Sequence, residues 1–469
     1  MRRVLVGCVI AILASSLAHG QSAARTRTTV LIRGVSIVDV VGGLLKTNMT
    51  IVVRGDRIVQ VTSSAGTSSS PNAEIVDAPG TFAIPGLWDM HVHTFFVGRR
   101  DWSAAGRDVI LPLFIANGVT GVRDMGSDLD RVLRARQEVG QGTLLGPHMV
   151  VAGPMLDGPG TAYRSVIQVS PSDARTAVDT LKQRGVDFIK VQSRLSRDAY
   201  LAIADESRRK GLTFVGHVPD AVLTTDAITA GQRSFEHLIG IFEGSSTLED
   251  DFVRGHAKSL AAFLDTFDSQ KEAALIRRLA AARTWQCPTL FWERVGYLAD
   301  QPNIMSDADA RYVPSLWSDT YWPSIAADIV KSAEPFAVRE RFIEHELGVV
   351  KRLHDAGIPF LAGTDTPSGI DLIPGFSLHH ELERFVAAGF TPLEALQTAT
   401  INPARFLGRL NDFGTVEPGR IADLVLLTAD PTKDIRNTRK IWAVVAAGQY
   451  LSRADLDHVL SRVEVAAQK

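Results

Sequence analysis

The stretch of sequence that decides the fold reads PGLWDMHVH and occupies residues 85–93. It is a short apolar run that ends in two histidines separated by one residue, His91 and His93. Alternate residues of a β-strand point to the same face, so both imidazoles are expected on one side of a buried strand.

Seven similar apolar runs follow this first one along the chain. They are GVTGVRDMG (118–126), PHMVVAG (147–153), VDFIKVQ (186–192), TFVGHVP (213–219), RSFEHL (233–238), TWQCPTLF (284–291) and IPFLAGTD (358–365). Segments with helical spacing, such as 172–185 and 197–211, lie between them. Strands that alternate with helices predict parallel βαβ units. Eight such units in about 280 residues predict an α/β fold of the (β/α)8 barrel type.

The two ends of the chain have a different residue pattern. Short β-branched runs interrupted by Gly, Asn and Asp occupy residues 29–62, and similar runs occupy 414–430 and 441–451. These patterns are typical of short antiparallel strands. Neither end has enough strands to bury a face alone, so we expect both ends to pair in one small sheet domain.

Residues 1–24 have the three parts of a secretory signal peptide. Two arginines precede a mostly apolar run, and small residues follow where a peptidase would cut, near Gly20 or Ala24. The apolar run is short for a membrane span, which disfavours an uncleaved anchor. We therefore expect the mature protein in a bacterial periplasm or outside the cell, with no membrane attachment after cleavage.

Composition excludes several classes of protein. The chain has 469 residues, of which 45% are hydrophobic and 22% charged, and its formal net charge is -2. These values exclude a disordered chain and disfavour nucleic-acid binding. The two cysteines, Cys8 and Cys287, cannot form a disulfide scaffold or a cysteine zinc cluster. The expected partner is a small-molecule substrate, and the oligomeric state stays open, a homo-oligomer included.

Potential metal ligands gather near the ends of five of the eight runs. They are His91, His93, Lys190, His217, His237 and Asp365. Each one alone has an ordinary structural explanation, as a core histidine, a strand-end lysine or a helix-capping aspartate. Together they favour a metal site, because barrel enzymes place their chemistry at the C-terminal ends of the strands. Imidazole and carboxylate suit zinc, manganese, cobalt or iron. A protonated lysine has no free lone pair, so Lys190 would have to deprotonate or become a carbamate.

These motifs resemble the amidohydrolase superfamily over about residues 29 to 455, nearly the whole mature chain. The resemblance rests on 85–93, Phe188-Ile189-Lys190-Val191, Gly216-His217, Glu236-His237 and Ala362-Gly363-Thr364-Asp365, with 118–126, Asn402-Pro403-Ala404 and 414–425. It implies a distorted (β/α)8 barrel over 85–410, with a small β-sandwich built from 25–84 and 411–469. It also implies two divalent metal ions, for which zinc is our expectation.

The resemblance assigns a role to each candidate ligand. His91, His93 and Asp365 would hold the inner metal, and His217 and His237 the outer one. Lys190, carrying a carbamate, would bridge the two metals together with a hydroxide. Asp365 would take the proton of the attacking hydroxide and pass it to the leaving nitrogen, as general base and then general acid.

Among the superfamily's branches, the chain looks most like the imidazolonepropionase-like and prolidase-like group, which includes Xaa-Pro and Xaa-Arg dipeptidases. The function implied is a secreted amidohydrolase that cleaves a C–N amide bond of a dipeptide or an N-acyl amino acid. Val218-Pro219 follow the fifth-run histidine where some relatives carry an aromatic or polar residue, which weakens a specific prolidase assignment.

Other functions stay open. A cyclic amide or lactone hydrolase would use the same metals, and a non-catalytic periplasmic binding protein is a minor alternative. A deaminase is disfavoured, because that branch usually works with one metal and has no need of Lys190.

Candidate pocket residues are less sharply defined. The tryptophan-rich stretch 284–322 is read first as helix packing and second as an apolar lid over the substrate. Tyr163 and Arg164 follow the third run and are a second pocket candidate. Arg123 is expected to pair with Asp124 or another structural acid rather than with a substrate carboxylate.

Overall fold

The computed structural model describes residues 29–66, 73–301 and 308–468. The expected signal peptide, residues 1–24, lies outside the described residues. Within the described part of the chain, no helix is both long and apolar enough to cross a bilayer.

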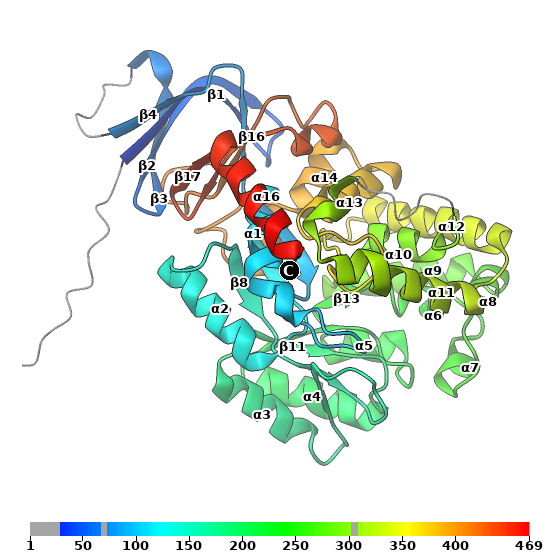
Figure 1. The fold of residues 1–469 in the computed structure, drawn as a ribbon. Helices are drawn as coiled ribbons and strands as arrows, with labels where there is room; N and C mark the ends of the chain where they lie inside the picture. The colour runs from blue at the N-terminus through cyan, green and yellow to red at the C-terminus, as the bar shows by residue number, and fades with distance from the viewer. Residues whose placement is uncertain (1–28, 67–72, 302–307, 469) are drawn as a thin grey trace, which may run out of the picture.

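Strands from the two ends of the chain lie in one eight-stranded sheet (Figure 1). Its strands are β1 (Thr29–Val38), β2 (Leu45–Arg54), β3 (Arg57–Ser63), β4 (Ala73–Asp77), β5 (Phe82–Pro85), β15 (Leu424–Leu427), β16 (Ile441–Ala446) and β17 (Gln449–Ser452). Their order is β17-β16-β15-β5-β1-β2-β3, and β4 also pairs with β1. The two ends meet where β5 pairs antiparallel with β15, in a register that sets Ile84 opposite Val425.

The central part of the chain contains parallel strands in two sheets. The three-stranded sheet has the order β6 (Leu87–Val92), β7 (Val119–Asp124) and β8 (His148–Val151). The six-stranded sheet has the order β10 (Val166–Gln168), β9 (Met155–Asp157), β11 (Phe188–Val191), β12 (Thr213–Gly216), β13 (Ser234–Glu236) and β14 (Trp285–Cys287). Each of the first seven apolar runs therefore contains a strand, in the parallel arrangement that the sequence predicts.

The eighth run, 358–365, lies between the two parallel sheets as an extended segment. Leu361 N donates to Gln286 O of β14 at 2.9 Å, and Met90 N of β6 donates to Ala362 O at 2.8 Å. On the far side, Asp187 N before β11 donates to Val151 O of β8 at 2.9 Å. Backbone hydrogen bonds thus link the two sheets at two places, although the strands do not form one continuous sheet.

Helices follow most of the parallel strands and cover them. They are α1 (Leu111–Ala116), α2 (Leu129–Gln141), α3 (Ala174–Arg184), α4 (Arg197–Arg209), α5 (Thr224–Ala230), α6 (Ile241–Gly244), α7 (Glu249–Val253), α8 (Leu260–Asp265), α9 (Ser269–Ala282), α10 (Leu290–Tyr297), α11 (Trp322–Ser332), α12 (Phe336–Asp355), α13 (Phe376–Ala387), α14 (Pro392–Thr398), α15 (Ile401–Phe406) and α16 (Arg453–Ala467). Local chemistry fixes their ends. Ser196 caps α4 by accepting from Ala199 N, and α3 stops at Gly185, whose φ of 85° suits glycine.

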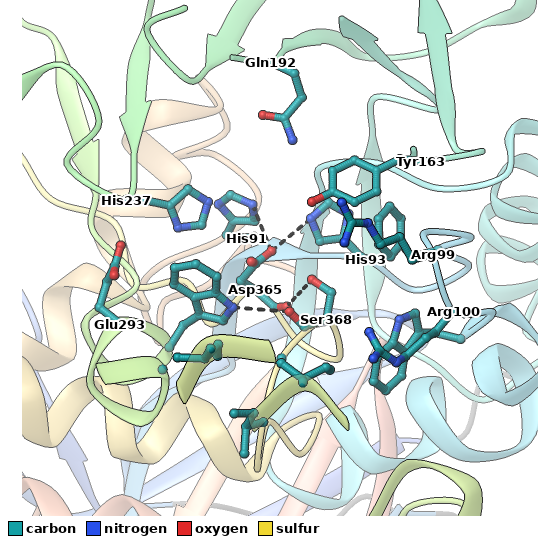
Figure 2. A pocket seen from close by; sticks show the side chains of 18 of the residues that line it. His91, His93, Arg99, Arg100, Tyr163, Gln192, His237, Glu293, Asp365 and Ser368 are labelled. Carbon is teal, nitrogen blue, oxygen red and sulfur yellow. Dashed lines mark hydrogen bonds and ion pairs between the residues drawn. The ribbon is translucent and has the colours of Figure 1, made fainter. Parts of the chain in front are cut away.

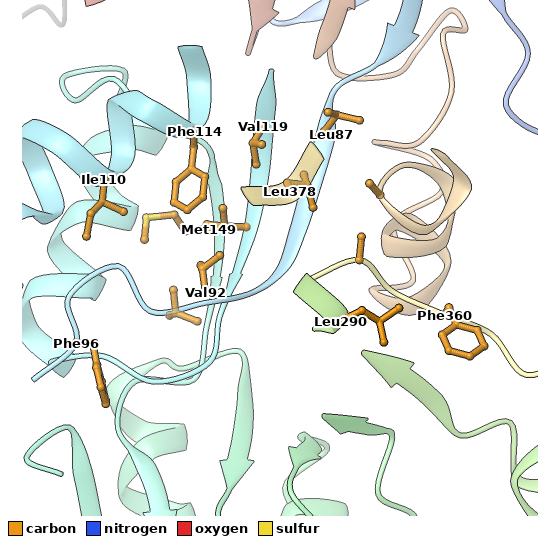
Figure 3. Close-up of a cluster of buried hydrophobic side chains, with 14 of the residues drawn as sticks. Leu87, Val92, Phe96, Ile110, Phe114, Val119, Met149, Leu290, Phe360 and Leu378 are labelled. Carbon is orange, nitrogen blue, oxygen red and sulfur yellow. The ribbon is translucent and has the colours of Figure 1, made fainter. Parts of the chain in front are cut away.

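The main hydrophobic core lies between these helices and the parallel strands. Leu87, Val92 and Val119 of β6 and β7 are fully buried beside Phe114 of α1, as Figure 3 shows. Helix α16 belongs to the same cluster through Leu456 and Val463, and it packs against α1. The last residues of the chain therefore cover the central part of the protein, although the sequence groups them with the terminal strands.

Candidate active site

All six candidate ligands line one cavity of about 720 Å³. His91 and Lys190 lie within strands β6 and β11, whereas His93, His217 and His237 each follow directly after the last residue of β6, β12 and β13. Asp365 ends the eighth run. The structure thus brings together side chains that are up to 274 positions apart (residues 91 to 365), as strand ends at one side of the parallel sheets.

The Asp365 carboxylate lies between two histidine rings (Figure 2). Its Oδ1 atom is 2.9 Å from His93 Nε2 and 3.3 Å from His91 Nε2. Burial alone would favour the neutral acid, but the neighbouring His91 and His93 outweigh it and lower the pKa of Asp365 to about 2. The carboxylate is therefore charged at neutral pH and faces the cavity.

Each of the four histidines uses Nδ1 for a hydrogen bond away from the others. The partners are Glu236 Oε2 for His91 (2.9 Å), Gly126 O for His93 (2.7 Å), Ser193 Oγ for His217 (2.8 Å) and Thr289 Oγ1 for His237 (2.6 Å). Such partners fix the orientation of an imidazole ring and leave Nε2 as the ring nitrogen that can bind a metal.

Burial also keeps three of these rings neutral. It lowers the pKa of His91 and His217 well below the usual value, and the pKa of His237 to about 4. Burial acts on His93 in the same direction, but its hydrogen bond to Asp365 prevails and raises the pKa of His93. A neutral imidazole has the lone pair that metal binding needs.

Lys190 carries a buried amine that makes no hydrogen bond to any described residue. Its side chain is almost fully buried, and Nζ has no hydrogen-bond partner among the described residues. Burial lowers the pKa of Lys190 to about 8. A buried, unpartnered ammonium is costly, so this position favours a neutral amine or a modified one.

Arg123 supports the site from behind and does not line the cavity. Its Nη2 donates to both carboxylate oxygens of Glu236, at 3.0 and 2.9 Å, and its Nε donates to Met90 O at 2.6 Å. Glu236 in turn holds His91. Arg123 therefore pairs with a structural acid, as expected, and that acid is Glu236 rather than Asp124.

Residues of the tryptophan-rich stretch lie partly in the core and partly in the cavity wall. Trp285, Trp317 and Trp322 are buried in the interior, whereas Trp292 and Tyr297 of α10 line the cavity. Tyr163 also lines it.

Sequence reasoning missed Arg99, Arg100, Gln192 and Glu293, which line the same cavity. Arg99 and Arg100 follow the first run within seven residues, and Glu293 follows the seventh run within two. For Arg99, Arg100 and Gln192, nearness to a strand end is a signal that would have found them.

Comparison with known proteins identifies the class. Residues 82–451 match the model of the amidohydrolase family, so the chain belongs to that family, as its motifs suggest. The family is one of hydrolases that act on carbon–nitrogen bonds.

Two curated relatives show how similar the chain is to individual members of the family. The chain is 38% identical over 263 residues to the imidazolonepropionase of Geobacillus kaustophilus. The aligned region covers 48% of this chain and 61% of that protein. It is 23% identical over 431 residues to the adenine deaminase of Rubrobacter xylanophilus, covering 90% and 57%. The chain thus spans less than two thirds of the length of these curated relatives.

Two solved structures have a similar fold over most of the chain. A protein of Bifidobacterium longum assigned as a prolidase superposes with a TM-score of 0.66 at 25% identity, covering 93% of this chain and 99% of that one. The bottromycin amidohydrolase superposes with a TM-score of 0.72 at 22% identity, covering 94% and 90%. The α/β fold is therefore that of the prolidase-like amidohydrolases.

Proposed function

We propose that this protein hydrolyses the amide bond of a dipeptide or an N-acyl amino acid, with two divalent metal ions held in the cavity. The observation that carries the proposal is the set of four cavity-lining histidines, each held by a hydrogen bond at Nδ1, together with Lys190, whose Nζ has no hydrogen-bond partner among the described residues, and the charged Asp365.

The donor set fits two metal ions. Ligand atoms of His91, His93 and Asp365 lie within 4.8 Å of one another, which suits one ion, and His217 and His237 would hold the second. Lys190 would join both after its neutral amine adds carbon dioxide and releases a proton, because the resulting carbamate offers two oxygens. Zinc is the metal we propose, and the bound ions would polarise the substrate carbonyl and make water a better nucleophile at neutral pH.

Asp365 supplies the proton transfers. Its carboxylate is ionised at neutral pH and faces the cavity, so it can accept a proton from the attacking water. It then delivers that proton to the leaving nitrogen, which departs as an amine.

Two further expectations are part of this proposal. The two parallel sheets and the segment between them would be the halves of a distorted (β/α)8 barrel, with the terminal strands as its β-sandwich. The signal sequence would place the enzyme in the periplasm or outside the cell.

A cyclic amide or lactone hydrolase is the second candidate, since the likeness to an imidazolonepropionase is the strongest in sequence identity among the relatives described above. The same cavity and ligands would serve it.

Metal analysis of the purified protein, run beside a hydrolysis screen, tests the proposal. The screen contains dipeptides, N-acyl amino acids, cyclic amides, lactones and adenine. About two metal ions per chain and cleavage of linear amides are expected. Cleavage of cyclic substrates alone would support the second candidate instead. Less than one metal ion per chain, with no activity after zinc and bicarbonate are added, would refute the proposed metal-dependent hydrolase.

Two variants sharpen this test. His217→Asn is expected to remove about one metal ion per chain, because the amide is a weaker zinc ligand. His379→Asn is the matched control, since His379 is buried and its Nδ1 also bonds a side-chain hydroxyl, Thr438 Oγ1, but it does not line the cavity. Equal metal loss in both variants would contradict the assignment.

A further inference from the structure

Glu293 is an acid in the cavity wall that the proposed chemistry does not use. It lies in the first turn of α10, six residues after β14 ends, and it is half-buried with its open side toward the cavity. Burial raises its pKa to about 8, and the hydrogen bond from the Tyr297 hydroxyl only partly offsets this. A carboxyl group is thus kept where water solvates it poorly.

No cation balances Glu293 within the described residues. The charged groups that act on it are acidic: Asp365 faces it across the cavity, and the buried Glu346 of α12 lies behind it. Both carboxyl oxygens of Glu346 lack a hydrogen-bond partner in the described part of the chain. Arg384 acts on Glu346, but no cation acts on Glu293, so a positive group bound at this end of the cavity would favour the ionised form of Glu293.

The opposite end of the cavity is basic. Figure 2 shows Arg99 and Arg100 on one side of the histidines and Asp365, with Glu293 on the other side. Arg100 Nη2 bonds Ser324 Oγ at 2.6 Å and lies 3.7 Å from Asp328 Oδ2. Arg99 is exposed and forms no ion pair with any described residue.

The cavity thus has an acidic end, a basic end and the ligand cluster between them. The walls that connect the ends are apolar, with Trp292, Ile239 and Ile370 among them. A ligand that spans this space with a positive group at one end and a negative group at the other matches both charges.

We propose that Glu293 is a specificity-determining residue that binds the free α-amino group of a dipeptide substrate, while Arg99 binds the carboxylate of the leaving residue. This inference rests on the proposed function and deepens it: the substrates are dipeptides with a free amino terminus, and N-acyl amino acids are poor ones. The scissile amide then lies between the ends, beside Asp365. An ammonium group supplies the cation that Glu293 lacks, and such charge-assisted hydrogen bonds are stronger than neutral ones.

The test compares alanyl-leucine with propionyl-leucine, which differ only in the amino group and release the same leucine. For the metal-loaded wild-type protein, kcat/KM is expected to favour alanyl-leucine by about tenfold or more, mainly through KM. Glu293→Gln keeps the shape and can still accept from Tyr297, and it is expected to bring the ratio close to one by slowing only alanyl-leucine.

Two control variants separate this effect from a general one. Arg99→Gln is expected to slow both substrates by the same factor, because both carry the leucine carboxylate, and so to leave the ratio unchanged. Asp328→Asn removes another acid from the cavity lining, near Arg100, and is also expected to leave the ratio unchanged. An unchanged ratio in Glu293→Gln, or no preference in the wild type, would overturn the inference.

A binding measurement distinguishes failure of this inference from failure of the proposed function. Phosphinic analogues of alanyl-leucine and propionyl-leucine are titrated calorimetrically into the wild-type protein and Glu293→Gln. If the protein hydrolyses amides but neither turnover nor binding favours the free amino group, the proposed function stands and the inference about Glu293 is wrong. Selective binding that depends on Glu293, without hydrolysis of any amide, supports the inferred site and removes the function.

Discussion

At the scale of single residues, Asp365 combines an unusual backbone with an unusual charge environment. Its φ of 60° lies in the left-handed region, and its carboxylate is close to two histidine rings. Asparagine tolerates left-handed backbone well, so Asp365→Asn keeps the geometry and removes the proton acceptor. This makes the substitution a clean probe of the proposed proton transfers.

We expect Asp365→Asn, compared as the metal-loaded variant, to lower kcat by roughly 10²–10⁴-fold, because an amide cannot carry the proton to the leaving nitrogen. The measurement is kcat on the best substrate of the screen, together with metal content. Asp328→Asn, which changes an acid at the exposed rim of the same cavity, is the control. Turnover near that of the wild type would sink the role of Asp365.

The sequence could predict which residues gather at the site, but only in part how they are held. The run-end positions of His93, His217 and His237 follow from strand periodicity. Their partners do not, because Gly126 O, Ser193 and Thr289 come from loops after neighbouring strands. Glu293 was missed for a related reason: a single acid on a helix has no local pattern, and only the packing of α10 against the cavity gives it a role.

At the scale of elements, Arg123 links strands of the two parallel sheets behind the ligands. It lies on β7 and donates hydrogen bonds to the Glu236 carboxylate on β13 and to Met90 O on β6. Both charged side chains are fully buried. Removing one partner of such a pair leaves an uncompensated charge in the interior.

Arg123→Met is therefore expected to lower the free energy of unfolding by about 3–5 kcal/mol. Arg33→Met is the control, because Arg33 pairs with Asp77 on the surface, where the two side chains are 35% and 65% exposed, and such pairs contribute under about 1 kcal/mol. Urea unfolding of both variants decides the matter. Similar small losses would mean that the buried pair does not hold these strands.

The strands themselves show where prediction from sequence ends. Seven runs contain strands because their apolar character is continuous and parallel strands are buried on both faces. The run 358–365 instead changes partner midway, from β14 at Leu361 to β6 at Ala362, and no regular ladder forms. Such a change depends on the positions of both neighbouring strands, which local periodicity does not encode.

At the scale of the whole molecule, three buried or half-buried carboxyl groups collect where α10, α12 and α13 meet beside the cavity. They are Glu293, Glu346 and Glu381, and burial raises the pKa of each. The unfolded chain releases these protons near the usual value of 4.5, whereas the folded protein keeps them to higher pH. The free energy of unfolding should therefore fall as pH rises above about 4.5 and go on falling until the raised pKa values are passed.

Glu346 isolates this effect best, since its carboxyl oxygens have no hydrogen-bond partner among the described residues and its pKa is raised well above the usual value. Glu346→Gln cannot ionise, so it is expected to flatten the decline in unfolding free energy between pH 5 and pH 8. One such proton accounts for at most about 1.4 kcal/mol per pH unit. Urea unfolding at pH 5, 6.5 and 8, with a chelator present to exclude metal binding, measures the slope. Glu344→Gln, two residues away on the exposed side of α12, should keep the wild-type slope, and the same slope in both variants would show that Glu346 is not held protonated by burial.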